Sequence, residues 1–139
     1  MKLPPTLKKT VLFVCVENAG RSQMAEGFFN SRYAPSGYRA VSAGTKPAGH
    51  INQVAVEAMK EVGIDISKQR SKIVTDDMIR GSVRAINMGC MDKAECPILF
   101  LNNPIDWSIA DPNGKSIERV RIIRNEIEKR VKDLAANLK

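Results

Sequence analysis

The feature that most constrains this chain is an apolar run that leads directly into a cysteine and a short loop. Residues 11–14 read Val-Leu-Phe-Val, and such β-branched and aromatic residues favour a buried central strand. Cys15 ends the run, and from Arg21 onward apolar residues recur with the period of a helix. The stretch therefore predicts a strand over about 10–15, a tight loop, and a helix over about 21–33.

The loop between this strand and this helix has the features of an anion site. Its amide N–H groups can converge at a helix N-terminus, where the helix dipole favours negative charge. The planar guanidinium of Arg21 can bind two oxygens of a tetrahedral oxyanion. The same positive surroundings favour the thiolate form of Cys15, which is its nucleophilic form, with Ser22 as a hydrogen-bond donor. The residues expected to bind the anion are Val16, Glu17, Asn18, Ala19, Gly20, Arg21 and Ser22.

Composition argues against several classes of function. The chain has 139 residues, of which 43% are hydrophobic, and this suits one domain over 1–139 with 1–9 as a flexible lead-in. The net charge of +7 is spread along the sequence and aromatic residues are only 5%, which argues against nucleic-acid binding. One histidine and three cysteines make a poor zinc set, so no cofactor or catalytic metal is expected.

The distribution of apolar residues also bears on location. No apolar run approaches the ~20 residues that span a bilayer. The first ten residues lack the apolar segment of a signal peptide. We therefore expect a cytoplasmic protein without membrane association, and we expect it to be a monomer.

The rest of the chain alternates strands with helices, separated by turn residues such as Gly63. This order predicts a three-layer α/β fold, a parallel sheet with helices on both faces. Ligands then bind beyond the carboxyl ends of the strands, where Cys15 lies. His50 is expected to be a surface or capping residue. Strands are expected over about 38–42, 82–88 and 105–108, and helices over about 51–62, 75–79 and 115–137.

Four residues of the loop carry a resemblance to a known family. Cys15, Asn18, Arg21 and Ser22 fit the pattern C-x2-N-x2-R-S. The stretch resembles the signature loop of the low-molecular-weight protein tyrosine phosphatases, a family that includes the thioredoxin-coupled arsenate reductases. The resemblance covers about 10–138 and implies that the parallel sheet has four strands.

A second match to the family is Asp111, which is followed by Pro112. Proline restricts the preceding residue toward extended conformations. In the family, an Asp-Pro pair in a late loop projects a carboxyl group over the anion. The resemblance implies that Asp111 protonates the departing oxygen, because an alkoxide or hydroxide leaves poorly. Family phosphatases usually place aromatic residues after this pair, whereas this chain has Asn113 and Gly114, as in the reductases.

Cys90 and Cys96 separate the two branches of the family. They flank a short polar segment, and two such thiols can form a disulfide if the segment moves. Alternatively, both are small buried apolar residues. The reductase branch uses one loop cysteine and two cysteines that flank a mobile segment. The resemblance therefore implies a relay of Cys15, Cys90 and Cys96 that a thioredoxin-like partner recycles.

Some reductases of this family hold a potassium ion near the loop. The residue types that they use occur here as Asn18, Glu26, Ser42 and Asp65, so the resemblance implies a candidate potassium site at these residues. The alternative is that the four side chains make ordinary hydrogen bonds and contacts with solvent.

These observations together favour an arsenate reductase that forms arsenite through the three-cysteine relay. One alternative is a low-molecular-weight phosphatase that hydrolyses phosphate monoesters through a phosphocysteine on Cys15. Another is a binding module that senses oxyanions or redox state with a disabled loop. The presence of Cys15, Arg21 and Asp111 together argues against the binding module.

Overall fold

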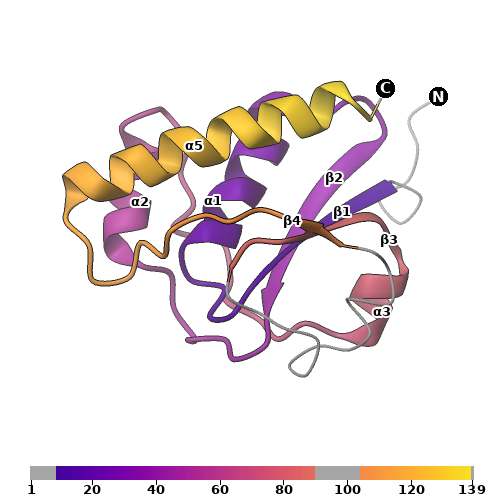
Figure 1. The fold of residues 1–139 in the computed structure, drawn as a ribbon, viewed down its shortest axis with the longest axis horizontal. Coiled ribbons are helices and arrows are strands. Elements are labelled where there is room, and N and C mark those ends of the chain that lie inside the picture. The colour runs from indigo at the N-terminus through magenta and orange to yellow at the C-terminus, as the bar shows by residue number, and fades with distance from the viewer. Residues whose placement is uncertain (1–8, 90–103, 139) are drawn as a thin grey trace.

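The computed structural model describes residues 9–89 and 104–138, and these form a parallel sheet with helices on both faces (Figure 1). The sheet contains β1 (Lys9–Cys15), β2 (Tyr38–Gly44), β3 (Ser82–Asn87) and β4 (Ile105–Asp106). Their order is β2-β1-β3-β4, and every neighbouring pair is parallel. The predicted fold class, a three-layer α/β domain with a four-stranded parallel sheet, is confirmed.

Strand β1 lies inside the sheet because its side chains are apolar on both faces. All four residues of the run 11–14 are fully buried. Val11 and Phe13 belong to the larger core cluster, whereas Leu12 and Val14 belong to the smaller one on the opposite face. This alternation is the period of two that a strand imposes on its side chains. The structure confirms the central strand expected from the sequence.

Among the described residues, one group of helices covers the face with the larger core, and a short helix covers the other face (Figure 1). The first group consists of α1 (Arg21–Phe28), α2 (Gln53–Lys60) and α5 (Ile117–Ala136). The short helix is α3 (Asp76–Arg80), which begins at Thr75, whose hydroxyl accepts a hydrogen bond from the Met78 amide. In the described ranges no helix is long and apolar enough to cross a membrane.

The first helix differs from the prediction of one α-helix over 21–33. After α1 the chain continues as a π-helix, η2 (Phe29–Tyr33). The Asn30 side chain pairs with both the N–H and the C=O of Ala40 in β2, at 2.8 and 3.0 Å. Tyr33 donates a hydrogen bond to Glu128 of α5 at 2.7 Å. These tertiary contacts favour the wider turn, and helical periodicity does not predict them.

The other boundaries shift by a few residues, mostly where a side chain caps a helix. The helix expected over 51–62 begins only at Gln53, because the Asn52 side chain accepts hydrogen bonds from the Val54 and Ala55 amides. Similarly, α5 follows the cap Ser116. The strand expected over 38–42 extends to Gly44, which pairs with Cys15. Conversely, the strands expected over 82–88 and 105–108 end at Asn87 and Asp106.

Two further expectations concern residues at or beyond the limits of the described chain. Lys9 was expected in the lead-in 1–9, but it opens β1 and pairs with Tyr38. Cys90 and Cys96 lie outside the described residues, as does the polar segment between them.

Candidate active site

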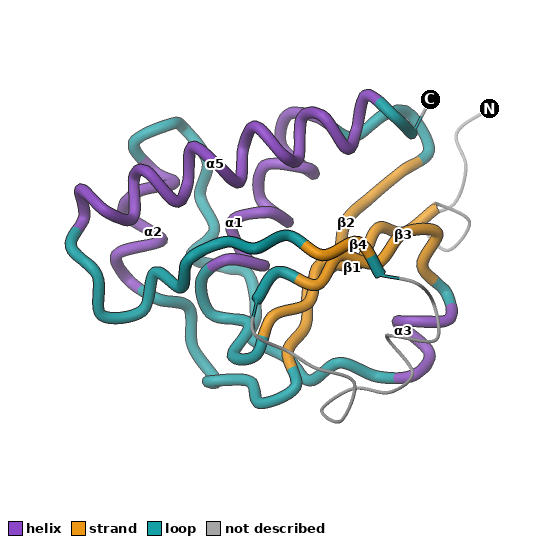
Figure 2. Tube along the Cα trace, viewed as in Figure 1, coloured by secondary structure: helices purple, strands orange, loops and turns teal. Residues whose placement is uncertain are grey.

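The site lies where β1 ends and α1 begins, at the carboxyl edge of the sheet. The loops that follow β1 and β2 leave the sheet at this same end (Figure 2). Cys15 is the last residue of β1 and is only 2% exposed. After five loop residues, Arg21 begins α1. The order of strand, anion loop and helix is as predicted.

The thiol of Cys15 lies within hydrogen-bonding distance of the Asn18 amide and the Ser22 hydroxyl. The Asn18 amide donates to Sγ at 3.2 Å, and the Ser22 hydroxyl oxygen lies 2.9 Å from Sγ. That oxygen also accepts a hydrogen bond from the Asn18 side-chain amide at 2.8 Å, which leaves the Ser22 proton free to point at the sulfur. Two donors can therefore be directed at the Cys15 sulfur, which holds it in place at the start of the loop.

Asn18 connects the loop to Gln23 and Lys72 through hydrogen bonds. Its backbone has φ of 51°, in the left-handed region that asparagine tolerates better than most residues. Its side-chain oxygen accepts a hydrogen bond from the Lys72 amide at 2.9 Å, and its own carbonyl accepts one from Gln23 at 2.9 Å. Asn18 and Ser22 are fully buried and do not line the pocket. Both were predicted to bind the anion, and the structure places them in contact with the Cys15 sulfur rather than at the surface of the cavity.

The guanidinium of Arg21 is fixed by backbone groups far away in sequence. Nη1 donates to the Ile109 carbonyl at 3.0 Å, and the side chain is 6% exposed. A Cβ atom at Gly89 would overlap the guanidinium. The end of β3 and the loop after β4 therefore hold the arginine between them.

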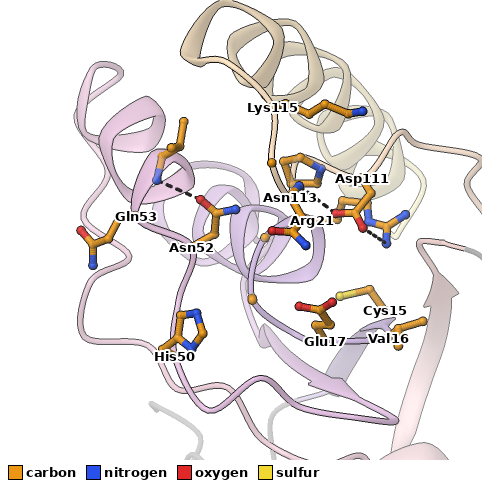
Figure 3. A pocket seen from close by; sticks show the side chains of 15 residues that line it. Cys15, Val16, Glu17, Arg21, His50, Asn52, Gln53, Asp111, Asn113 and Lys115 are labelled. Atoms are coloured by element: carbon orange, nitrogen blue, oxygen red, sulfur yellow. Dashed lines mark hydrogen bonds and ion pairs between the residues drawn. The ribbon is translucent and has the colours of Figure 1, made fainter.

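Asp111 faces this arginine from the late loop, as Figure 3 shows. Its Oδ2 lies 3.9 Å from Nη2 of Arg21, and its side chain is 54% exposed. Its other carboxylate oxygen accepts a hydrogen bond from the Asn113 amide at 2.9 Å, which fixes the turn after it. An exposed carboxyl group held beside the arginine can deliver a proton to an oxygen of a bound anion.

Gly20 is required by close packing and not by an unusual backbone conformation. Its φ is −131°, outside the left-handed region. A Cβ atom at this position would lie 2.6 Å from Cγ of Pro112. Glycine is therefore needed because the Asp111-containing loop packs directly on the cysteine loop.

The cysteine opens into a cavity of about 530 Å³ (Figure 3). From the anion loop, the cavity is lined by Val16, Glu17, Ala19, Gly20 and Arg21, which were predicted to bind the anion. The cavity is also lined by residues that the sequence interpretation missed, among them His50, Asn52, Gln53 and Lys115. His50 is exposed, as expected, and its Nδ1 lies 3.2 Å from the Ala48 carbonyl. It also lines the cavity, which was not expected. The sequence did contain one indication of this placement. His50 and Asn52 follow a predicted strand, and the loops after parallel strands lie at one edge of the sheet.

The four residues expected at a potassium site do not form one set. Ser42 donates a hydrogen bond to Glu26 Oε1 at 2.8 Å. Asp65, in contrast, accepts hydrogen bonds from the amide and hydroxyl of Ser67, and the hydroxyl contact chiefly lowers its pKa. The group found beside Glu26 is the ammonium of Lys72, with Nζ 3.8 Å from Oε1.

This arrangement does not fit a potassium ion. A second cation at Glu26 would be repelled by the Lys72 ammonium. Burial raises the pKa of Glu26, and Lys72 opposes that effect.

Cys15, Arg21 and Asp111 line one cavity, and their side chains can serve as a nucleophile, an oxyanion clamp and an acid. Such a site can attack the central atom of a tetrahedral oxyanion and protonate the departing oxygen. The fold and the site thus define a cysteine-dependent enzyme of the phosphatase type.

Comparison with known proteins agrees with this class. The model of the family described as low molecular weight phosphotyrosine protein phosphatase matches residues 10–139. The chain belongs to this family.

Similar proteins within the family include arsenate reductases. The chain is 38% identical over 122 residues to an arsenate reductase of Staphylococcus aureus, covering 87% of this chain and 92% of that protein. A solved structure titled an arsenate reductase in the phosphate binding state superimposes with a TM-score of 0.80 and 34% identity, covering 94% of this chain and 99% of the other. The structure of a thioredoxin-dependent arsenate reductase of Corynebacterium glutamicum superimposes with a TM-score of 0.77 and 36% identity. The match covers 96% of this chain and 63% of that chain.

Proposed function

We propose that this protein reduces arsenate to arsenite with electrons from a thioredoxin-like dithiol. The observation that carries the proposal is the oxyanion site of Cys15, Arg21 and Asp111 in a chain similar to named arsenate reductases along most of its length. The sequence supplies the two further cysteines that this chemistry needs, Cys90 and Cys96. The proposed location is the cytoplasm, where such a dithiol is kept reduced.

The first step is addition of the thiolate to arsenic. The Cys15 sulfur attacks arsenate held by the loop amides and Arg21, and an S–As bond forms. Asp111 protonates one departing oxygen, which leaves as water. The pocket supports this step because Cys15, Arg21 and Asp111 line the same cavity, with the Asp111 carboxyl group beside the Arg21 guanidinium (Figure 3).

The second stage transfers two electrons. The Cys90 thiolate attacks the Cys15 sulfur, the S–As bond breaks, and its electron pair stays on arsenic, which becomes As(III). Cys96 then attacks Cys90, which releases Cys15 as a thiolate and leaves a Cys90–Cys96 disulfide. A thioredoxin-like dithiol reduces that disulfide and is itself oxidised.

A thiol count on the reduced protein tests this proposal directly. Arsenate is added without any partner, and free thiols and arsenite are measured. We expect three free thiols to fall to one, with one arsenite released per chain. The Cys15→Ser variant should release no arsenite, and Cys90→Ser should stop after arsenate has added. Three retained thiols and no arsenite would contradict the proposal.

A phosphatase is the second candidate, because the matching family model is that of a phosphotyrosine phosphatase. Phosphate and arsenate have similar shape and charge, so hydrolysis of a phosphate ester by Cys15 alone would not decide between them. The decisive comparison is Cys90→Ser. A phosphatase should keep full turnover in this variant, whereas the proposed reductase should lose multiple turnover of arsenate.

A further inference from the structure

Lys72 and Glu26 form an ion pair next to the cysteine loop, and Lys72 contacts Asn18 of that loop. Glu26 is on α1, and its side chain is only 13% exposed. Its Oε1 accepts a hydrogen bond from Ser42 of β2 and lies 3.8 Å from Lys72 Nζ. A carboxylate in such a position is costly to bury unless a positive charge or several donors compensate it.

Lys72 also touches the loop through its backbone. Its amide donates to Oδ1 of Asn18 at 2.9 Å, and its carbonyl accepts a hydrogen bond from the Gly44 amide at 2.9 Å. Its ammonium further donates to the Arg70 carbonyl at 3.1 Å. One residue therefore joins α1, the end of β2 and the loop that holds Cys15.

The path from Lys72 to the nucleophile is short. Asn18, held by the Lys72 amide, donates its backbone N–H to the Cys15 sulfur and its side-chain N–H to Ser22. Ser22 in turn contacts the same sulfur. A displacement of Lys72 would therefore move the two groups that contact the Cys15 sulfur.

We propose that Lys72 is a positioning residue that supplies, from within the chain, the positive charge beside Glu26, and that the cysteine loop consequently works without a bound potassium ion. The ammonium already lies beside a carboxylate oxygen of Glu26 and the carbonyl oxygen of Arg70, which are the kinds of ligand that a potassium ion uses. This inference rests on the geometry of the loop, and it holds for arsenate reduction and for phosphate-ester hydrolysis alike.

The experiment compares the wild-type protein with Lys72→Met, which keeps the aliphatic chain and removes the charge. Lys68→Met is the matched control, because Lys68 is an exposed lysine of the same connecting segment. Thermal unfolding and kcat/KM are measured in potassium chloride and in choline chloride at equal ionic strength. The rates of arsenate reduction and of p-nitrophenyl phosphate hydrolysis are both measured. If the protein does not reduce arsenate, the phosphate-ester assay still tests the role of Lys72.

We expect the wild-type protein and Lys68→Met to show the same Tm and kcat/KM in both salts. Lys72→Met should lose about 5 °C in Tm and about tenfold in kcat/KM in choline chloride, with partial recovery in potassium chloride. A wild-type Tm or kcat/KM that rises in potassium chloride would overturn the proposal. So would a Lys72→Met variant that behaves like Lys68→Met.

Two further variants separate charge from packing. Lys72→Arg keeps the charge, so its Tm and kcat/KM should be the same in potassium chloride and choline chloride. This variant also tests the proposal if Lys72→Met does not fold. Adding Glu26→Gln to Lys72→Met removes the unpaired carboxylate, so the double variant should recover part of the lost activity. If the losses in Tm and kcat/KM of the two single variants simply add in the double variant, the two residues do not act as a charge pair.

Discussion

At the scale of single residues, the site depends on close backbone approaches as much as on reactive groups. Gly20 and Gly89 each leave room for another part of the site, the Pro112 ring and the Arg21 guanidinium respectively. Neither residue can react, yet each fixes where a reactive neighbour lies. Substitution at these positions should therefore reduce function without removing any chemical group.

Gly89→Ala tests this idea at the arginine. The added methyl group would overlap the guanidinium and displace it from the Ile109 carbonyl. We expect phosphate affinity, measured by isothermal titration calorimetry, to fall about tenfold or more, close to the loss in Arg21→Lys. Unchanged affinity would show that the guanidinium has room to move aside.

Asp111→Asn tests the assignment of the acid. The amide retains the shape of the side chain but cannot donate a proton in the way a carboxyl group does. We expect kcat to fall by roughly 10²- to 10⁴-fold while phosphate affinity changes little. Asp106→Asn, an exposed carboxylate in β4, is the control and should keep the wild-type kcat. Equal losses in both variants would argue against proton donation by Asp111.

At the scale of elements, the pocket wall is built by the start of α2. Asn52 caps this helix with hydrogen bonds of 2.9 and 3.2 Å to the Val54 and Ala55 amides. The cap itself and the next two residues line the cavity. The stability of this first turn therefore affects the shape of the substrate pocket.

Asn52→Ala should lower the free energy of unfolding by about 1 kcal/mol, because two amides lose their acceptor. It should also raise KM, because the wall loses its fixed position. Thr75→Ala removes the cap of α3, on the other face of the sheet, and serves as the comparison. We expect it to reduce stability, measured by urea unfolding, without a change in KM. A raised KM in both variants would point to general loosening.

At the scale of the whole molecule, α2 and α5 are joined by charged side chains. Glu61, which follows α2, accepts hydrogen bonds from Arg121 at 2.7 Å and from Arg124 at 3.0 Å. Arg124 is buried and also donates to the Ala58 carbonyl. Hydrogen bonds from Arg121, followed by those from Arg124, lower the pKa of Glu61 from 4.5 to about 2.

This lowered pKa predicts a pH dependence of stability. A carboxyl group whose pKa is lower in the folded state stabilises the fold above its unfolded pKa, and the effect is lost as pH falls toward the folded pKa. The Tm of Glu61→Gln should therefore lie below that of the wild-type protein at neutral pH. The difference should shrink between about pH 4.5 and pH 2, and high salt should reduce it because the pair is exposed. A difference independent of pH would contradict this assignment.

The order of the elements and the identity of the reactive groups are local properties, and the sequence determined them. The run 11–14 can be buried on both faces only as an inner strand, and Cys15 must then lie at the carboxyl edge of a parallel sheet. The strand, loop and helix around Cys15 were predicted correctly for this reason. The π-helix Phe29–Tyr33 was not predicted, because contacts of Asn30 and Tyr33 with distant elements select it.

Which residues share a site was decided by the tertiary structure alone. Asp65 and Lys72 are both polar residues in one connecting segment, and nothing in their local pattern shows that the lysine reaches Glu26 while the aspartate turns to Ser67. His50 enters the pocket wall for the same reason, through the packing of one loop beside another. Side-chain chemistry is local and readable from the sequence, whereas contacts between distant residues exist only once the sheet and its helices have packed.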